Sequence, residues 1–120
     1  MFSRIFPLLV TGALVTGCAT DPGPKPDDQL AATEAALLSA TNAGGEDTEP
    51  SMIIGAREKL NTAENLIADE RYEEARRLLE QAEVDARLAE ARADTQKVRE
   101  ELGDVRTSID SLRRNLENQN

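Results

Sequence analysis

A single helical pattern runs from Arg71 to Leu116. Apolar residues recur there at alternating steps of three and four, which is the spacing that lines one side of an α-helix. At about 1.5 Å per residue this helix would be roughly 70 Å long, whereas a helix of an ordinary globular domain has ~12 residues. The sequence therefore predicts that one long rod organises the molecule.

The apolar residues of this helix form two rows on different faces. The rows are offset by two residues, roughly 200° around a helix with 3.6 residues per turn, so they point in nearly opposite directions. We therefore expect a separate packing partner on each face. The early row consists of Tyr72, Ala75, Leu79, Ala82, Ala86, Ala89 and Ala93. The late row consists of Val84, Leu88, Ala91, Thr95, Val98, Leu102, Val105, Ile109, Leu112 and Leu116.

Two shorter helices are expected before the rod. The first covers about residues 28–43, and either Asp27 or Asp28 can cap its start. An acidic loop then leads to Pro50, which suits the first position of a second helix over about residues 51–68. The first helix carries only a thin apolar stripe, so the second is the better partner for the early row.

The predicted fold class is all-α. Only a short connection separates residues 51–68 from a third helix over residues 71–93, so these two helices are expected to be antiparallel neighbours. Aromatic residues make up only 2% of the chain, which leaves much of the packing to alanine. We expect a helical hairpin or three-helix arrangement over residues 28–93. Residues 94–120 would continue the last helix as an amphipathic, coiled-coil-like tail.

The first seventeen residues are typical of a signal peptide. Arg4 precedes an apolar run that is too short to span a ~30 Å hydrocarbon layer and that ends in small residues. The segment ends with Val15, Thr16 and Gly17, and Cys18 follows it. These four residues resemble the lipobox of bacterial lipoproteins. The resemblance implies that residues 15–17 are recognised by a signal peptidase and that acyl chains are attached to Cys18.

The rest of the N-terminal region agrees with a lipid anchor. A lone cysteine in an exported protein cannot form an internal disulfide, although an ordinary secretory peptide with an incidental cysteine remains the alternative. Two or more acyl chains hold a protein stably at a bilayer. Ala19 and Thr20 follow Cys18, and in lipoproteins of this kind the absence of Asp there implies the outer membrane, with the protein facing the periplasm. Residues 18–27 would be a proline-rich, extended tether.

The helical region resembles a bacterial envelope family. The stretch AREKLNTAENLIADERYEEARRLLEQAEVDARLAEARA, residues 56–93, together with the lipobox, the proline tether and the charged helical tail, is similar to the domain-of-unknown-function family four-three-nine-eight (DUF4398). In that family the helical module often precedes an outer-membrane-protein-A-like peptidoglycan-binding domain, and no such domain is expected before Asn120. The residues that carry the resemblance are Ala56 to Leu60, Ala63, Tyr72 to Ala75, and Glu83 to Ala89.

Composition argues against several classes of function. A formal net charge of −9 disfavours nucleic acid, whose phosphates require a basic protein surface. The chain has no histidine, and its one cysteine is assigned to lipid, so no catalytic residue, metal site or small-molecule substrate is expected. No cofactor is expected beyond the acyl chains on Cys18. We therefore predict a protein that is not an enzyme.

The late row is the candidate binding site. The first two helices are too short to cover it beyond about Asp94, and an amphipathic helix alone would leave its apolar stripe in water. Valine dominates one heptad position and leucine the other, which resembles parallel two-stranded coiled coils. We expect the tail to bind a second copy of the chain or another envelope protein, although a helix that frays in solution is the alternative. The predicted interaction residues are Val98, Leu102, Val105, Ile109, Leu112 and Leu116.

Two functional hypotheses remain from the sequence. The first is a lipid-anchored structural or protein-interaction module of the cell envelope. The alternative is a periplasmic chaperone-like or regulatory lipoprotein that binds apolar segments of clients or modulates an envelope enzyme. Crosslinking in membranes separates them, because the first predicts one dominant partner and the second a broad set.

Overall fold

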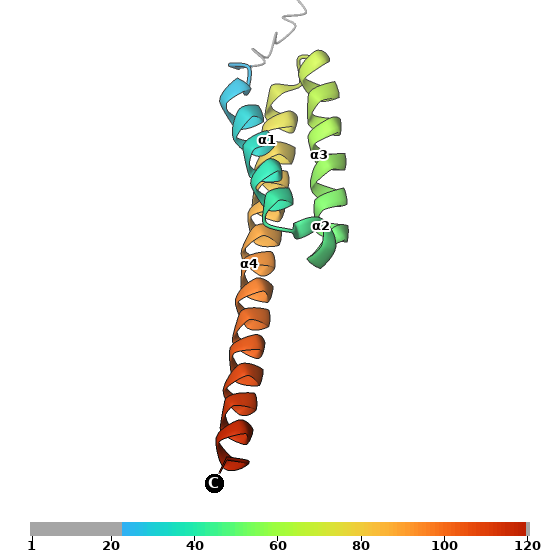
Figure 1. Ribbon diagram of the computed structural model, residues 1–120. Coiled ribbons are helices and arrows are strands. Elements are labelled where there is room, and N and C mark those ends of the chain that lie inside the picture. Colours follow the sequence, from blue (N-terminus) through green and yellow to red (C-terminus); the bar gives the residue numbers. More distant parts are fainter. Residues whose placement is uncertain (1–22, 120) are drawn as a thin grey trace, which may run out of the picture.

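The computed structural model describes residues 23–119, and this part of the chain is all-α. Figure 1 shows two helices lying beside the first half of a long helix, whose second half projects alone. The helices are α1 (Asp27–Asn42), α2 (Gly45–Thr48), α3 (Pro50–Ala68) and α4 (Tyr72–Glu117). The predicted fold class, including the long C-terminal helix, is confirmed. The predicted signal peptide and lipid attachment site lie outside the described residues.

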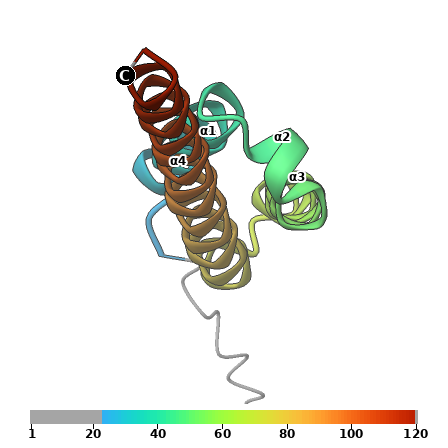
Figure 2. The same cartoon turned by 60° about the horizontal axis from the view of Figure 1, so that its bottom comes forward.

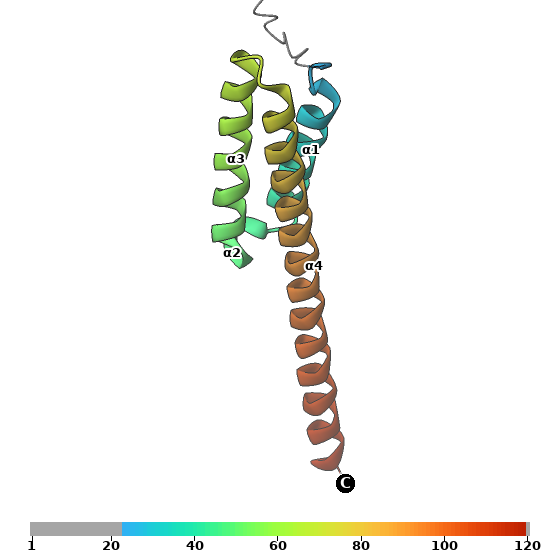
Figure 3. The same ribbon diagram turned by 180° about the vertical axis from the view of Figure 1, so that it is seen from behind.

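Helix α4 is the element on which the others pack. α1 and α3 lie on either side of its first half, and views from below and from behind show the same arrangement (Figures 2 and 3). With 46 residues, α4 is about 69 Å long at 1.5 Å per residue. The early row of α4 faces α3, as predicted, and α1 packs on it as well, which the thin apolar stripe of that helix did not indicate. Its buried members are Ala75, Leu79, Ala82, Ala86, Ala89 and Ala93.

Alanine fills most of the bundle core. Besides the α4 alanines, Ala40, Ala56 and Ala63 are completely buried. Small side chains let helices approach closely but remove little apolar surface from water, and burial of that surface stabilises by about 25 cal/mol per Å². The largest fully buried side chains are Ile53, Leu79 and Thr33.

Thr33 is a polar residue in this core, and it links α1 to α4. Its hydroxyl oxygen lies 2.8 Å from the carbonyl oxygen of Gln29 and 3.1 Å from that of Leu79. A buried hydroxyl without a partner would be costly, so these acceptors explain why threonine is tolerated here. The contact with Leu79 crosses between two helices and fixes their relative position.

The connection from α1 to α3 differs from the prediction. The segment expected to be an acidic loop contains the one-turn helix α2. Gly44 precedes it with φ +91, a left-handed conformation that glycine adopts without strain. Gly45 is buried, and a Cβ atom there would lie 2.7 Å from the carbonyl oxygen of Ala40. The two glycines therefore let the chain turn tightly against the end of α1.

The start of α1 also differs from the prediction. The helix begins at Asp27, the residue before it is Pro26, and no side chain caps the N-terminus. Asp27 and Asp28 instead occupy the first turn, where their negative charge is favoured by the positive end of the helix dipole. α3 begins at Pro50 and α4 at Tyr72, each one residue from its predicted start.

The turn from α3 to α4 has the hydrogen bonds of a helix end that usually contains glycine, but no glycine is present in it. The amide of Arg71 donates to the carbonyl of Leu66 at 2.8 Å, and the amide of Glu70 donates to that of Ile67 at 3.1 Å. This pair of bonds is a Schellman motif, which needs a left-handed residue. Glu70 supplies it with φ +60. The turn places α3 antiparallel to α4, as predicted.

Candidate functional site

The side of α4 that faces away from the bundle carries a row of large apolar residues. We call this row the seam. Each of its residues is between 42% and 64% exposed. The structure thus brings the predicted interaction residues onto one exposed face, and Val84 and Leu88 extend that face alongside the bundle. The seam consists of Val84, Leu88, Val98, Leu102, Val105, Ile109, Leu112 and Leu116.

The exposure of the seam follows from the length of α4. Residues 94–119 are exposed at every position, because α1 and α3 pack only on the early part of the helix. The bundle does not wrap around to the opposite side of α4, so Val84 is also exposed. Monomeric proteins rarely expose large apolar patches, and those that exist often mark interaction sites. The alternating steps of three and four along the row are the spacing found in helix–helix packing.

The order of the steps along α4 corrects one sequence interpretation. In a coiled coil, position d follows position a by three residues, and the next a follows d by four. Leu88 to Ala91 is a step of three and Val84 to Leu88 a step of four, so the leucines lie mostly at a and the valines at d. This is the reverse of the order that favours two parallel strands. Leucine at a with a β-branched residue at d is associated with three or four strands.

Arginines follow one flank of the seam at every seventh residue, and the sequence interpretation missed them. They occupy position e, next to the apolar residues at d, over four successive heptads. The opposite flank, position g, carries Asp94 and Glu101. The seven-residue repeat of arginine is visible in the sequence once the heptad is assigned. The four arginines are Arg92, Arg99, Arg106 and Arg113.

A polar groove lies where α4 leaves the bundle. It has a volume of ≈ 730 Å³ and lies between the α2–α3 connection and α4. Arg92 spans it, with Nη1 3.1 Å from Glu49 Oε2 and 3.6 Å from Met52 Sδ. Within the groove, Arg92 and Glu49 form an ion pair. Its lining residues are Asp47, Thr48, Glu49, Arg92, Thr95, Gln96, Arg99 and Glu100.

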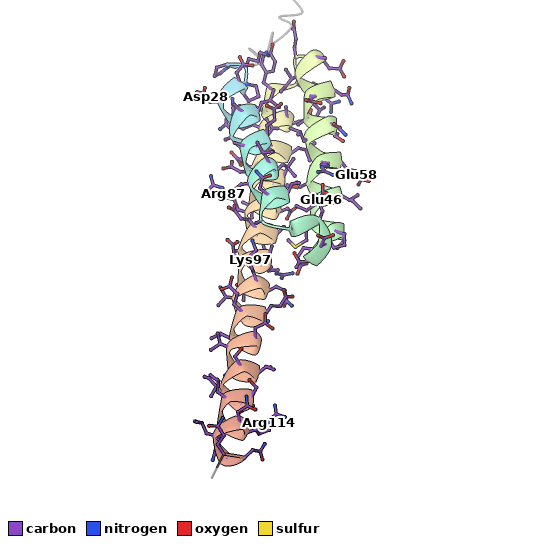
Figure 4. All side chains as sticks on the ribbon, viewed as in Figure 1. Asp28, Glu46, Glu58, Arg87, Lys97 and Arg114 are labelled. Atoms are coloured by element: carbon purple, nitrogen blue, oxygen red, sulfur yellow. The ribbon has the colours of Figure 1, made fainter. Side chains whose placement is uncertain are left out.

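The described residues form no cluster of side chains of the kind that binds a metal ion. Within residues 23–119, no three histidine, cysteine, aspartate or glutamate side chains gather as metal ligands would. Charged side chains instead project outward along the whole length, from Asp28 near one end to Arg114 near the other (Figure 4). Among helices α1 to α4, none combines the length and apolarity needed to cross a bilayer.

The N-terminal end of the described chain lies at the end of the bundle from which α4 starts. Arg76 Nη2 donates to the carbonyl oxygen of Pro24 at 3.1 Å, and Lys25 pairs with Asp27 at 2.7 Å. The hydrogen bond and charge of Asp27 raise the pKa of Lys25. These contacts hold Pro24 near the start of α4 and pair Lys25 with the first turn of α1. The free end of α4 points the opposite way (Figure 1).

Two charges stabilise the first turn of α4. Arg71 Nε donates to Glu74 Oε1 at 2.8 Å. The hydrogen bond and charge of Arg71 lower the pKa of Glu74, and Glu74 in turn raises the pKa of Arg71. Glu74 also lies near the positive end of the helix dipole, which favours its ionised form.

Comparison with known proteins identifies the helical module. Residues 28–105 match the family described as Domain of unknown function (DUF4398). The crystal structure of a DUF4398 family protein from Pseudomonas aeruginosa PAO1 is 38% identical to this chain, with a TM-score of 0.76, and the match covers 81% of this chain and 100% of that one. No curated protein matches the sequence. The matched residues include the bundle and the first part of the projecting helix, and the chain therefore belongs to the DUF4398 family.

Proposed function

We propose that this protein is a lipid-anchored, non-catalytic interaction module of the bacterial cell envelope that binds protein partners through the seam of α4. The observation that carries the proposal is the apolar seam, whose eight residues are all exposed. Such a surface would be unfavourable in water, and it has the spacing that another helix recognises. Acyl chains on Cys18 would hold the protein at the outer membrane with its helices in the periplasm.

The arrangement of the molecule supports an anchored rod. The chain enters the bundle at the end where α4 starts, and Arg76 holds Pro24 there. A lipid attached upstream at Cys18 would therefore place the bundle near the membrane, with the free end of α4 directed away from it. At about 1.5 Å per residue, residues 94–117 would reach roughly 36 Å beyond the bundle.

The anchor is tested by fractionation. The unaltered protein should sediment with outer membranes and resist washing with high salt, because two or more acyl chains hold a protein stably. The Cys18→Ala variant should appear in the soluble fraction. A Thr20→Ala variant serves as a matched control and should remain in the membrane. Release of the unaltered protein by salt would contradict the lipid anchor.

The seam is tested by site-specific photocrosslinking in cells. A photoreactive residue at Leu102 should trap one dominant protein product. The same probe at Thr107, an exposed position on the other side of the tail, should not trap it. A broad smear from Leu102 would favour the chaperone-like alternative. Equal products from both positions would contradict the seam as the binding surface.

A further inference from the structure

The charged residues beside the seam bear on the direction in which two copies of α4 could pack, given the proposed function in which the seam binds protein. In a parallel coiled coil, position g of one chain lies beside the position e that follows five residues later in the other chain. In an antiparallel pair, e lies beside e and g beside g. The two arrangements therefore bring different charges together.

Parallel packing brings opposite charges together along the projecting tail. Asp94 would lie beside Arg99 of the other copy, and Glu101 would lie beside Arg106. Within residues 23–119 these four side chains make no ion pair and no hydrogen bond in the single chain. They are thus available for contacts between copies, and two complementary pairs form on each side of the interface.

Flanking charges nearer the bundle are already paired within the chain. Parallel packing would bring Arg87 close to Arg92 of the other copy, which by itself would be repulsive. Arg87 Nη2, however, lies 2.5 Å from Glu83 Oε1, and Arg92 Nη1 lies 3.1 Å from Glu49 Oε2. In a parallel pair, each of these arginines would therefore approach the arginine of the other copy with a carboxylate of its own chain beside it.

Antiparallel packing brings like charges together. The e flank carries arginine at four successive heptads, so arginines would lie beside arginines along the interface. On the other flank, Glu101 would lie near Glu101 of the second copy. We propose that the seam binds further copies of this same chain, packed parallel and in register, and that the g-to-e pairs Asp94–Arg99 and Glu101–Arg106 set this direction.

This direction agrees with the position of the N-terminal segment. In a parallel assembly the Pro24 ends of all copies lie at the same end, so every chain could reach one membrane. An antiparallel pair would place the two N-terminal ends on opposite sides. Because a shared membrane could by itself align the copies, the test uses full chains that carry Cys18→Ser.

Introduced cysteines distinguish parallel from antiparallel packing of two copies of α4. Leu88 and Leu112 lie 24 residues apart, roughly 36 Å along the helix. In a parallel, in-register assembly, Leu88→Cys chains should form disulfides with each other, and so should Leu112→Cys chains. In an antiparallel pair neither would, because a disulfide requires Cα atoms within about 7 Å. An antiparallel pair would instead link the two variants when they are mixed.

Charge-reversal variants test whether the ion pairs between copies set the direction of packing. Glu101→Arg should weaken association roughly tenfold, because it turns each Glu101–Arg106 pair into a repulsive one. Adding Arg106→Glu should restore association, since the pair is then reversed. Glu100→Arg changes the net charge by the same amount at a position away from the seam, and it should leave association unchanged. Failure of the double variant to recover would overturn the proposed pairing.

The outcomes separate this inference from the proposed function. Disulfides only in the mixture of the two cysteine variants would overturn parallel packing while leaving the seam as a binding surface. A chain that sediments as a monomer at tens of micromolar, together with a dominant Leu102 crosslink to a different protein, would also overturn the inference alone. A monomer without any seam-specific crosslink would overturn both.

Discussion

Residues 72–93 and 94–117 belong to one helix but use apolar side chains in opposite ways. In the first segment alanines are buried against α1 and α3, and only Val84 and Leu88 are exposed large apolar residues. In the second segment all the valines and leucines and the one isoleucine are exposed. In folded proteins the large apolar residues are among those most often buried. The comparison shows that small side chains let the helices of the bundle approach closely, while the larger apolar side chains of α4 stay exposed in the single chain.

The largest expected difference comes from truncating one leucine in each segment. Leu79→Ala should lower the free energy of unfolding of the bundle by about 2–5 kcal/mol, because Leu79 is completely buried and its loss leaves a cavity. Leu102→Ala should change bundle unfolding by less than about 0.5 kcal/mol and weaken association instead. Urea unfolding followed by fluorescence of Tyr72, the one tyrosine, measures the bundle. Equal effects of the two variants would remove the distinction between the segments.

The close packing of the bundle is tested at Gly45. Gly45→Ala should destabilise by about 1–3 kcal/mol, because its Cβ would lie 2.7 Å from the carbonyl oxygen of Ala40 and 3.3 Å from Ile53 Cδ1. Gly55→Ala in α3 is the matched control, since a Cβ there meets nothing within 4 Å. The control should stabilise by about 1 kcal/mol through helix propensity. Thermal unfolding of both variants shows whether their effects have opposite signs.

A glycine-to-alanine substitution in the tail compares the projecting segment with the bundle. A Cβ at Gly103 meets nothing within 4 Å, so Gly103→Ala should add about 1 kcal/mol of helix stability to the projecting segment. Bundle unfolding should stay unchanged, while helix content and self-association should both rise. Circular dichroism at several protein concentrations measures the effect. A loss of association would mean that Gly103 itself lies in an interface.

The smallest expected effect is a pH dependence at the bundle end of α4. Arg71 lowers the pKa of Glu74. The pair therefore stabilises the folded state above the ordinary pKa of a glutamate, and this contribution is lost as the pH falls below about 5. Glu74→Gln should flatten that part of the pH profile of thermal stability. Glu100→Gln, in the tail, should leave the profile of the bundle unchanged.

The periodic features of the fold could be predicted from the sequence. The seven residues of the early row identified the face of α4 that packs in the bundle. The six predicted interaction residues identified the exposed apolar face of the tail. Both predictions depend on local repetition, which the order of residues contains directly. The lipid attachment at Cys18 and the localisation stay predictions, since they concern residues outside the described part.

Features that depend on how the helices are placed against each other could not be predicted. The approach of Gly45 to Ala40 follows from how the α1–α2 turn folds toward Ile53, and nothing at Gly45 alone indicates it. Glu70 adopts a left-handed conformation that its residue type disfavours, because the antiparallel placement of α3 and α4 requires the turn. The arginine flank was missed for a different reason, since the two heptad positions had been assigned in reverse order.

The continuation of α4 past its last buried alanine, Ala93, has a consequence for dynamics. Beyond that residue the backbone hydrogen bonds of the helix depend on local propensity, because no other element of the same chain covers them. Amide protons there should exchange with solvent quickly in an isolated chain and slowly in an occupied one. Hydrogen–deuterium exchange of residues 94–117 would therefore report whether the proposed binding surface is occupied.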